Sequence, residues 1–442
     1  MSLSNLRNGD SSLSETYILP KIKRVLLTYW DRLSAFHPNA RLYLLNVTLT
    51  GAVMGIYRLL FNFYVLSLGF DEALLGTLIT TSSLTSLLAA LPMGYLSDFI
   101  GRKPALIIGG LASVFGIAIM IAAPSVGVLV AMSVLIGLGQ GLAGVTMGPF
   151  LMENSGEKER TYLFSFSAGF TMASAFVGNS FGGYLPAWMG GLLGSTASST
   201  AAYGGALAVI AFGAALGSIP LFFLRKPQGG ANQSSRFAPV YYFQKQPALL
   251  GRLILPMLVT SVGAGLIMPF MNVFFRQVHH LPDPLIGSMF AWGSLAMGAG
   301  LMIAPPLAER YGKIQLVVLT QAISIPFLMM LGFAPWFMMS AAAYFVRVAL
   351  MNMSGPIYQT YVMEAVEPDA RATVASLVSM ANNFGWALSP VLSGWLQVRY
   401  GFGPPFAITL VLYILSTYLY WRYFWRKQPA LQSAPMPVTG KK

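Results

Sequence analysis

The chain lacks cysteine and carries little charge. None of its 442 residues is cysteine, three are histidine, and 9% are charged. The absence of cysteine excludes disulfides, iron–sulfur clusters and thiolate metal sites. There is also no Gly-x-x-x-x-Gly-Lys-Ser/Thr loop for phosphate, and the histidines fall outside the apolar runs. We therefore expect no cofactor, no metal and no enzymatic activity.

Apolar residues dominate what is present. They make up 55% of the chain, and the mean hydropathy is +0.64. A soluble protein of this length could not keep so much apolar surface from water, so we expect an integral membrane protein in a lipid bilayer. Runs of about 20 apolar residues are long enough to span it. They predict an all-α protein of twelve transmembrane helices near 42–68, 74–97, 105–123, 127–151, 161–186, 201–224, 251–275, 284–308, 315–333, 337–363, 372–397 and 404–424.

The basic residues predict which side faces the cytoplasm. With the spans placed, 23 Lys and Arg residues fall on one side, and Arg276 and Arg399 fall on the other. The positive-inside rule places the first side, with both termini, in the cytoplasm of a plasma (inner) membrane. The net charge of +13 thus reflects topology, and we expect no nucleic-acid partner.

Charged and glycine-rich segments divide the chain. We expect a cytoplasmic N-terminal segment at 1–41, a six-helix bundle at 42–224, a cytoplasmic linker at 225–250, a second bundle at 251–424 and a tail at 425–442. Within the first segment, apolar residues at helical spacing over 18–36 are typical of an amphipathic helix on the membrane surface. A tail without such a helix is the alternative.

An offset of 211 residues aligns the two halves without gaps. The matching pairs are Gly76 and Gly287, Asp98 and Glu309, Gly101 and Gly312, Arg102 and Lys313, Gly144 and Gly355, Met152 and Met363, Glu153 and Glu364, Arg160 and Arg371, and Gly183 and Gly394. Charged loop residues that agree in one register indicate a duplicated six-helix unit. Two such units inserted in parallel are typical of transporters whose halves move around a central cavity.

Two loops carry a family resemblance. The segment Gly94-Tyr95-Leu96-Ser97-Asp98-Phe99-Ile100-Gly101-Arg102-Lys103 resembles the loop signature of the major facilitator superfamily, and Leu307-Ala308-Glu309-Arg310-Tyr311-Gly312-Lys313 looks like its degenerate second copy. With the repeat, the resemblance covers residues 42–424. It departs from the family pattern at Phe99, where a basic residue is usual. The resemblance implies a secondary transporter that works by alternating access on a small-molecule substrate, expected to be a monomer.

The same resemblance implies a cytoplasmic gate. Gly101 permits a tight reversal and Gly94 a close helix approach, while Asp98 can accept hydrogen bonds from a helix N-terminus or pair with Arg160. Such contacts form while the cytoplasmic ends of the halves are together, which implies a latch for the outward-open state. Simple anchoring of helix ends at the lipid headgroups is the alternative. The candidate gate residues are Gly94, Asp98, Gly101, Arg102, Glu153, Arg160, Glu309, Gly312, Lys313, Glu364 and Arg371.

Two arginines fall inside predicted spans. A central arginine costs about 2.5–3.5 kcal/mol on insertion scales, so Arg58 and Arg347 each need water, a partner or a task. Both sit about 5 Å to the outer side of the midplane at 1.5 Å per residue, where they could face one cavity layer. None of the 14 acidic residues lies near mid-membrane. The two arginines either attract an anionic group of the substrate or bond to helix carbonyls and water.

The remaining cavity candidates are polar or aromatic residues within the spans: Asn62, Gln140, Asn272, Asn382, Asn383 and Trp386. Any of the polar ones could instead form an interhelical hydrogen bond. Spans 1, 4, 7 and 10 line the cavity in the family that the loops resemble, which suits Arg58 and Asn62 in span 1 and Arg347 in span 10. The segment Gly178-Asn179-Ser180-Phe181-Gly182-Gly183 is similar to a Gly-Pro-x-x-Gly-Gly element of drug/proton antiporters, with Asn179 in place of the proline.

These features leave the substrate and the coupling open. We expect a secondary transporter, with export of amphipathic organic compounds ahead of organic-anion transport through Arg58 and Arg347. A membrane sensor or scaffold on the same fold is the alternative from another class. Protons are one candidate coupling ion, and the carboxylates that could carry them stand at the predicted cytoplasmic ends: Asp98, Glu153, Glu309 and Glu364.

Overall fold

The computed structural model describes residues 36–225, 247–366 and 371–425, and within these ranges the regular elements are helices. The first half contains α2 (Pro38–Ser67), α3 (Glu72–Ile100), α4 (Arg102–Ala122), α5 (Val126–Glu153), α6 (Glu157–Gly182), α7 (Leu185–Leu192) and α8 (Thr200–Phe222). The second half contains α10 (Pro247–Ile267), the 3-10 turn η1 (Met268–Phe270), α11 (Met271–Val278), α12 (Asp283–Tyr311), α13 (Lys313–Phe333), α14 (Phe337–Ala365), α15 (Arg371–Tyr400) and α16 (Gly403–Phe424). The expected surface helix at 18–36, most of the linker and the tail lie outside the described residues.

The helices confirm the predicted all-α membrane fold. Each of the twelve predicted spans coincides with a long helix or, for the seventh, with the series α10, η1 and α11. In the described part of the chain, ten helical segments are long and apolar enough to cross a membrane. The two that fall short, α6 and α15, occupy corresponding places in the two halves.

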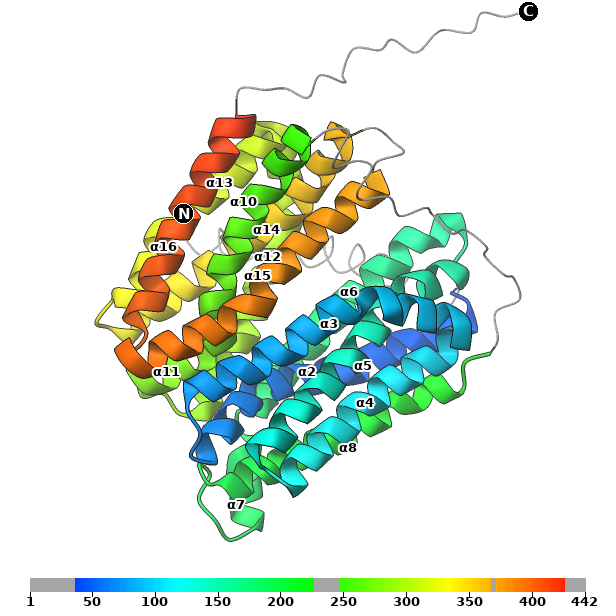
Figure 1. Ribbon diagram of the computed structural model, residues 1–442, viewed down its shortest axis with the longest axis vertical. Helices are drawn as coiled ribbons and strands as arrows, with labels where there is room; N and C mark the ends of the chain where they lie inside the picture. Colours follow the sequence, from blue (N-terminus) through cyan, green and yellow to red (C-terminus); the bar gives the residue numbers. More distant parts are fainter. Residues whose placement is uncertain (1–35, 226–246, 367–370, 426–442) are drawn as a thin grey trace, which may run out of the picture.

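Two bundles make up the molecule. Figure 1 shows the first bundle (α2 to α8) and the second bundle (α10 to α16) meeting at their lower left and diverging toward the upper right. The bundles are joined along two seams, where α3 packs against α15 and α6 packs against α12. Each seam therefore pairs one helix from each half.

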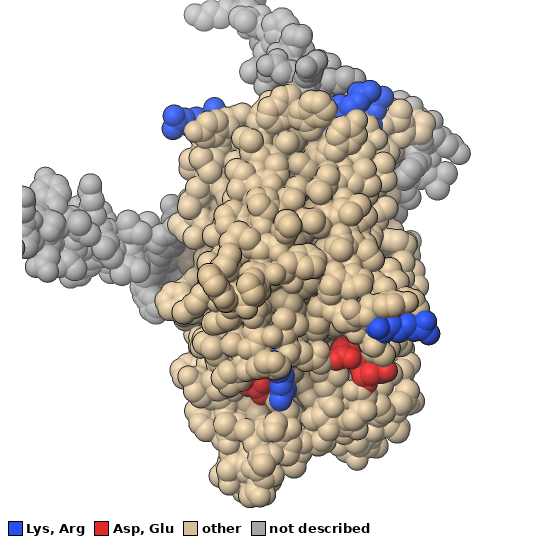
Figure 2. All heavy atoms as spheres, turned by 90° about the vertical axis from the view of Figure 1, so that its left-hand side faces the viewer, with Lys and Arg blue, Asp and Glu red and all other residues tan. Residues whose placement is uncertain are grey.

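Charged side chains mark the two ends of the membrane-spanning part. In Figure 2 a broad band free of Lys, Arg, Asp and Glu separates charges near the top from charges lower down. We call the helix ends that carry Arg102, Arg310 and Arg422 the basic side and the other ends the opposite side. The basic side is the one that the positive-inside rule predicts to be cytoplasmic.

Local sequence explains where the helices start and turn. Asp71, Ser125 and Ser199 cap α3, α5 and α8 by accepting hydrogen bonds from backbone N–H groups three residues on. Gly101 and Gly312 join successive helices with φ of +91° and +94°, a conformation that glycine adopts without steric cost. These two glycines are equivalent in the 211-residue repeat, so the repeat extends to backbone geometry.

The structure differs from the prediction in two places. The seventh span is not a continuous helix, because Pro269 lacks an N–H and the chain forms η1 around it. The fifth span ends at Gly182 rather than near residue 186, and a separate short helix, α7, follows on the opposite side. Pro186 in the first turn of α7 suits a new helix start.

Candidate functional site

The seams close tightly near the opposite side. A β-carbon at Gly76 on α3 would lie 2.3 Å from the carbonyl oxygen of Pro390 on α15. A β-carbon at Gly287 on α12 would lie 2.6 Å from the carbonyl oxygen of Asn179 on α6. Both the glycines and the carbonyls are related by the 211-residue offset, so the closure is symmetric. Only glycine permits backbones to approach this closely.

A second symmetric pair of contacts lies at the ends of the same helices. A β-carbon at Gly183 would lie 2.4 Å from the carbonyl oxygen of Asp283, and one at Gly394 would lie 2.1 Å from that of Glu72. Asp283 and Glu72 are the first residues of α12 and α3. Four glycines thus bring the halves together on the opposite side.

An amide pair joins the halves near the same end. Asn62 on α2 donates hydrogen bonds to the carbonyl oxygen of Pro269 at 2.7 Å and to Oδ1 of Asn272 at 2.8 Å. Asn272 donates to the carbonyl oxygen of Leu59 at 2.7 Å. Both amides are almost fully buried. The sequence predicts these two asparagines as cavity residues, and in this conformation they hold the halves together instead.

A cluster of one carboxylate, one guanidinium and one hydroxyl also joins the halves on the opposite side. The hydroxyl of Tyr203, at the start of α8, donates to Oδ2 of Asp283 at 2.6 Å. Arg276 on α11 places Nη1 3.8 Å from Oδ1 of the same carboxylate, and its guanidinium lies 4.4 Å from the ring centre of Phe63. The side chain of Asp283 is 12% exposed. We call Tyr203, Arg276 and Asp283 the opposite-side latch.

The repeat mate of Asp283 makes a weaker contact. Glu72 accepts a hydrogen bond of 2.6 Å from Nε2 of Gln277, and this pair is exposed to solvent. The partner is neutral, whereas Asp283 has a cation and a hydroxyl. The two symmetric positions have therefore diverged.

His279 lies beside this region, between α11 and α12. Its ring packs among Phe274, Phe275 and Phe337, and burial lowers the pKa of the imidazole below its ordinary value of 6.5, with the neighbouring His280 acting in the same direction. Burial therefore favours the neutral form of the His279 imidazole.

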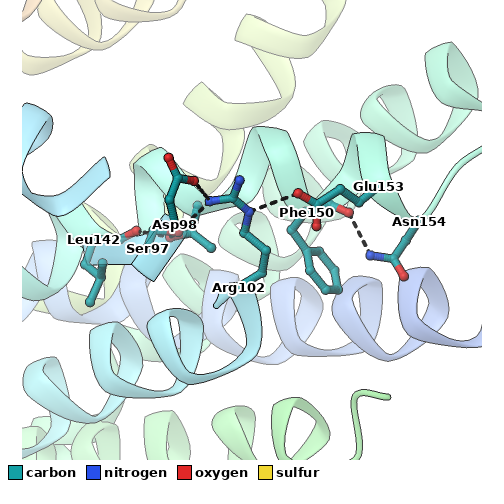
Figure 3. Close-up of polar contacts among 8 residues, drawn as sticks. Ser97, Asp98, Arg102, Leu142, Phe150, Glu153 and Asn154 are labelled. Atoms are coloured by element: carbon teal, nitrogen blue, oxygen red, sulfur yellow. Dashed lines mark hydrogen bonds and ion pairs between the residues drawn. The ribbon is translucent and has the colours of Figure 1, made fainter. Parts of the chain in front are cut away.

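On the basic side, the predicted gate residues form networks within each half. Figure 3 shows Arg102 between two carboxylates: its guanidinium donates to Asp98 and, from Nε at 3.0 Å, to Glu153. Nη1 also donates to Ser97 at 3.0 Å, and Ser97 accepts from Thr146 at 2.8 Å. Asp98 thus pairs with Arg102 here, rather than with Arg160 as one prediction had it.

The second half repeats the central part of this network. Lys313 donates to Glu364, as Arg102 does to Glu153, and each pair is related by the 211-residue offset. Glu309 and Arg371, the mates of Asp98 and Arg160, are exposed. The Nε atom of Arg160 is buried and has no hydrogen-bond partner among the described residues. A charge network links helix ends inside each half, and its role in gating stays a prediction.

The helices are open where they approach the basic side. A β-carbon at Gly94, Gly144 or Gly148 would meet no described atom within 4 Å. Tyr95, next to Gly94 on α3, is 77% exposed, and Phe99, near the end of the same helix, is 89% exposed. The same helix α3 is therefore packed tightly at Gly76 and free at Gly94. The described helices of the two halves are closed on the opposite side and diverge toward the basic side (Figure 1).

The structure separates the two intramembrane arginines. Arg58 is exposed and lies on α2 one turn before Asn62, whose amide bonds to the second half. Arg347 is 1% exposed and lies inside the second bundle, with its guanidinium 5.2 Å from the ring centre of Tyr413. The shared cavity layer that the sequence predicts does not form here, because position 347 faces the interior of its own bundle.

The other residues predicted to line the cavity are at least partly exposed in the structure. Gln140 on α5 and Asn383 on α15 are exposed, Trp386 is 38% exposed, and Asn382 is half-buried. By contrast, Gly51 and Gly55, which precede Arg58 on α2, pack against α6. Gly178 of the glycine element in α6 packs against the backbone of Ala52. Helix packing therefore accounts for that element.

Sequence reasoning missed the opposite-side latch. Tyr203 and Asp283 are 80 residues apart, and neither stands in a recognisable motif. One signal was present: Arg276 is one of two basic residues on the side that otherwise lacks them. A basic residue on the side of the membrane that has few of them could have indicated a nearby carboxylate partner.

The fold and the arrangement of its halves define a membrane transporter with two symmetric bundles. A family model described as the Major Facilitator Superfamily matches residues 43–282 and 253–436. The chain belongs to this superfamily, and it is a secondary transporter rather than an enzyme. A sequence comparison with curated proteins found no match.

Solved structures of transporters are similar in fold. A bacterial homologue of the human lysosomal transporter Spinster, in an inward-facing and unoccupied conformation, has a TM-score of 0.71 at 14% identity over 89% of this chain and 96% of that chain. The nucleoside transporter NupG has a TM-score of 0.69 at 14% identity over 88% and 100%. A D-xylose–proton symporter has 0.69 at 15% identity over 86% and 97%. At these identities the likeness extends to the fold alone.

Proposed function

We propose that this transporter moves an organic anion by alternating access and that Arg58 contacts the anionic group. The observation that carries the proposal is an exposed arginine in the middle of α2, one turn before Asn62, whose amide bonds to the second half. No ion pair to Arg58 is found among the described residues, and the acidic residues that the structure describes lie at or next to helix ends. A cation in a membrane needs a partner, and a substrate can provide it.

The asymmetric closure supports alternating access. Contacts on the opposite side hold the halves together, while the helices stand apart at the basic side. We place the basic side in the cytoplasm of the plasma (inner) membrane, with both termini there, because of the 23 basic residues. In this orientation the conformation described here is inward-facing. We take the functional unit to be the monomer, since one chain supplies both halves.

Export of amphipathic compounds has weaker support. The expectation of export follows chiefly from analogy with other transporters of this type. The glycine element in α6 supports it only weakly, and close packing against α2 and α12 already explains Gly178 and Gly183. Proton coupling also stays a proposal. The carboxylates that could serve it on the basic side include Glu153 and Glu364, each bound to a cation in its own half.

A binding assay on purified protein tests the anion proposal. The full chain is screened for ligand-dependent thermal shifts against organic anions, sugars, amino acids and cationic dyes. We expect stabilisation by members of the anion set, and we expect Arg58→Glu to remove it, because charge reversal turns attraction into repulsion.

Arg252→Glu is the matched control. Arg252 is an exposed arginine of α10 near the basic side, so its reversal changes net charge equally without touching the centre of the fold. Stabilisation by sugars or cationic dyes alone would contradict the proposal, as would an anion response that survives in Arg58→Glu.

A further inference from the structure

Arg347 is the largest of the fully buried side chains in the described part of the chain. It lies on α14, ten residues from the start of the helix at Phe337, and 1% of its surface is exposed. Its neighbours are aromatic: Tyr344 is one turn earlier on the same helix, and Tyr413 comes from α16. Both tyrosines are themselves buried.

The guanidinium of Arg347 makes no hydrogen bond of ordinary geometry to a described residue, although the Tyr413 hydroxyl lies close enough to interact with it. Its Nε, Nη1 and Nη2 atoms are all buried and unpaired among the described residues. Arginine carries five N–H donors and stays protonated in proteins. The N–H donors of Arg347 therefore require several hydrogen-bond acceptors that lie in the plane of the guanidinium.

Tyr413 meets only part of this requirement. Its ring centre, 5.2 Å away, can attract the charge through the π face, and its hydroxyl can accept from one N–H group, but neither supplies a negative charge or satisfies the remaining donors. Ordered water could accept those hydrogen bonds, yet it would leave the charge unbalanced in a region of low dielectric constant. An anion satisfies the charge and the donors together.

We propose that the second bundle holds a small anionic group at Arg347. The chemistry is that of a single negative charge with acceptor lone pairs, supplied by a free halide ion or by the carboxylate of a bound solute. Planar guanidinium N–H groups bind a carboxylate through two parallel hydrogen bonds, and two or more of them can converge on a single halide ion. The site is enclosed within one half, and it is separate from Arg58, which is exposed on α2. The inference does not depend on anion transport.

The experiment compares thermal stability in different anions. Purified full-length chain is held at constant ionic strength in gluconate, which is too bulky for an enclosed site, and gluconate is exchanged stepwise for chloride or bromide. In a second arm, short carboxylates are added without halide. We expect a saturable rise of a few degrees in the unfolding midpoint in one arm or the other, since a ligand that binds only the folded state stabilises it.

Two variants locate the response. Arg347→Met should lose the anion-dependent rise and be at least as stable as the parent chain in gluconate, because it removes an unpaired buried charge. Arg58→Met, which removes the other intramembrane arginine, should keep the rise. Binding of radioactive chloride or of a labelled short carboxylate to the parent chain gives a second readout that needs no variant to fold.

The arms also identify the source of the anion. A rise with halide alone assigns a free ion, and a rise with carboxylates alone assigns a solute. Absence of any anion dependence and of any binding would overturn the proposal, as would an unchanged response in Arg347→Met.

Discussion

Replacing Gly76 by valine is expected to abolish closure of the halves on the opposite side. A β-carbon there would lie 2.3 Å from the carbonyl oxygen of Pro390, so α3 and α15 must move apart. Overpacking against a backbone costs about 1–3 kcal/mol or more. At 1.4 kcal/mol per tenfold change, about 3 kcal/mol shifts the conformational equilibrium more than 100-fold. We expect the variant to populate mainly the state that is open on the opposite side.

A matched glycine on the same helix gives the contrasting result. Gly94 is on α3 too, and a β-carbon there meets no described atom within 4 Å. Gly94→Val should therefore leave the present conformation intact. If the basic side closes in the other state, the same change should instead disfavour that state.

Spin-label distances can measure these populations. Because the chain has no cysteine, Ser198→Cys and Pro335→Cys, two exposed loop positions on the opposite side of different halves, provide unique labelling sites. The distance between the labels should lengthen in Gly76→Val and stay short in Gly94→Val. A short distance in both variants would show that the seam tolerates a side chain and that the glycine contacts do not control closure.

Removing the carboxylate of Asp283 is expected to loosen the same closure. The side chain accepts a hydrogen bond from Tyr203 of the first half and lies near Arg276. A hydrogen bond to a charged group contributes about 1.5–3 kcal/mol, which corresponds to a shift of about 10- to 150-fold toward the open state in Asp283→Ala. The pair of labels at 198 and 335 reports this shift as a growing long-distance population.

The internal repeat provides the control for this change. Glu72 occupies the equivalent helix start, and its carboxylate contacts Gln277 at an exposed site. Glu72→Ala should therefore have a much smaller effect, since exposed contacts contribute little. Equal shifts in the two variants would mean that loss of an N-terminal helix charge, and not the bond to Tyr203, opens the halves.

Much of the fold could be predicted because apolar length and charge placement are local properties of the sequence. The twelve spans follow from apolar runs, and the repeat follows from the loop residues that agree at one offset. The break at Pro269 was readable in principle, because proline cannot continue the hydrogen-bond ladder. We predicted one continuous helix for the seventh span because its apolar run continues through Pro269.

The site was harder to predict because it depends on which helix faces meet. Asn62 and Asn272 have the composition of cavity residues, and only the packed halves reveal that they bond to each other. Arg347 has the depth of a cavity residue, but the rotation of α14 turns it inward to Tyr413. Depth follows from counting residues along a span, whereas rotation follows from neighbours that a single sequence does not identify.

The low apolarity of α6 and α15 has a consequence for how the chain enters the bilayer. These helices are the seam partners of α12 and α3, and the glycines and polar residues that allow close packing make them poor spans when alone. Each is preceded in the chain by four spans of its own half. A nascent α6 or α15 would therefore partition into lipid with the help of helices already inserted, which makes biogenesis of each half a cooperative process.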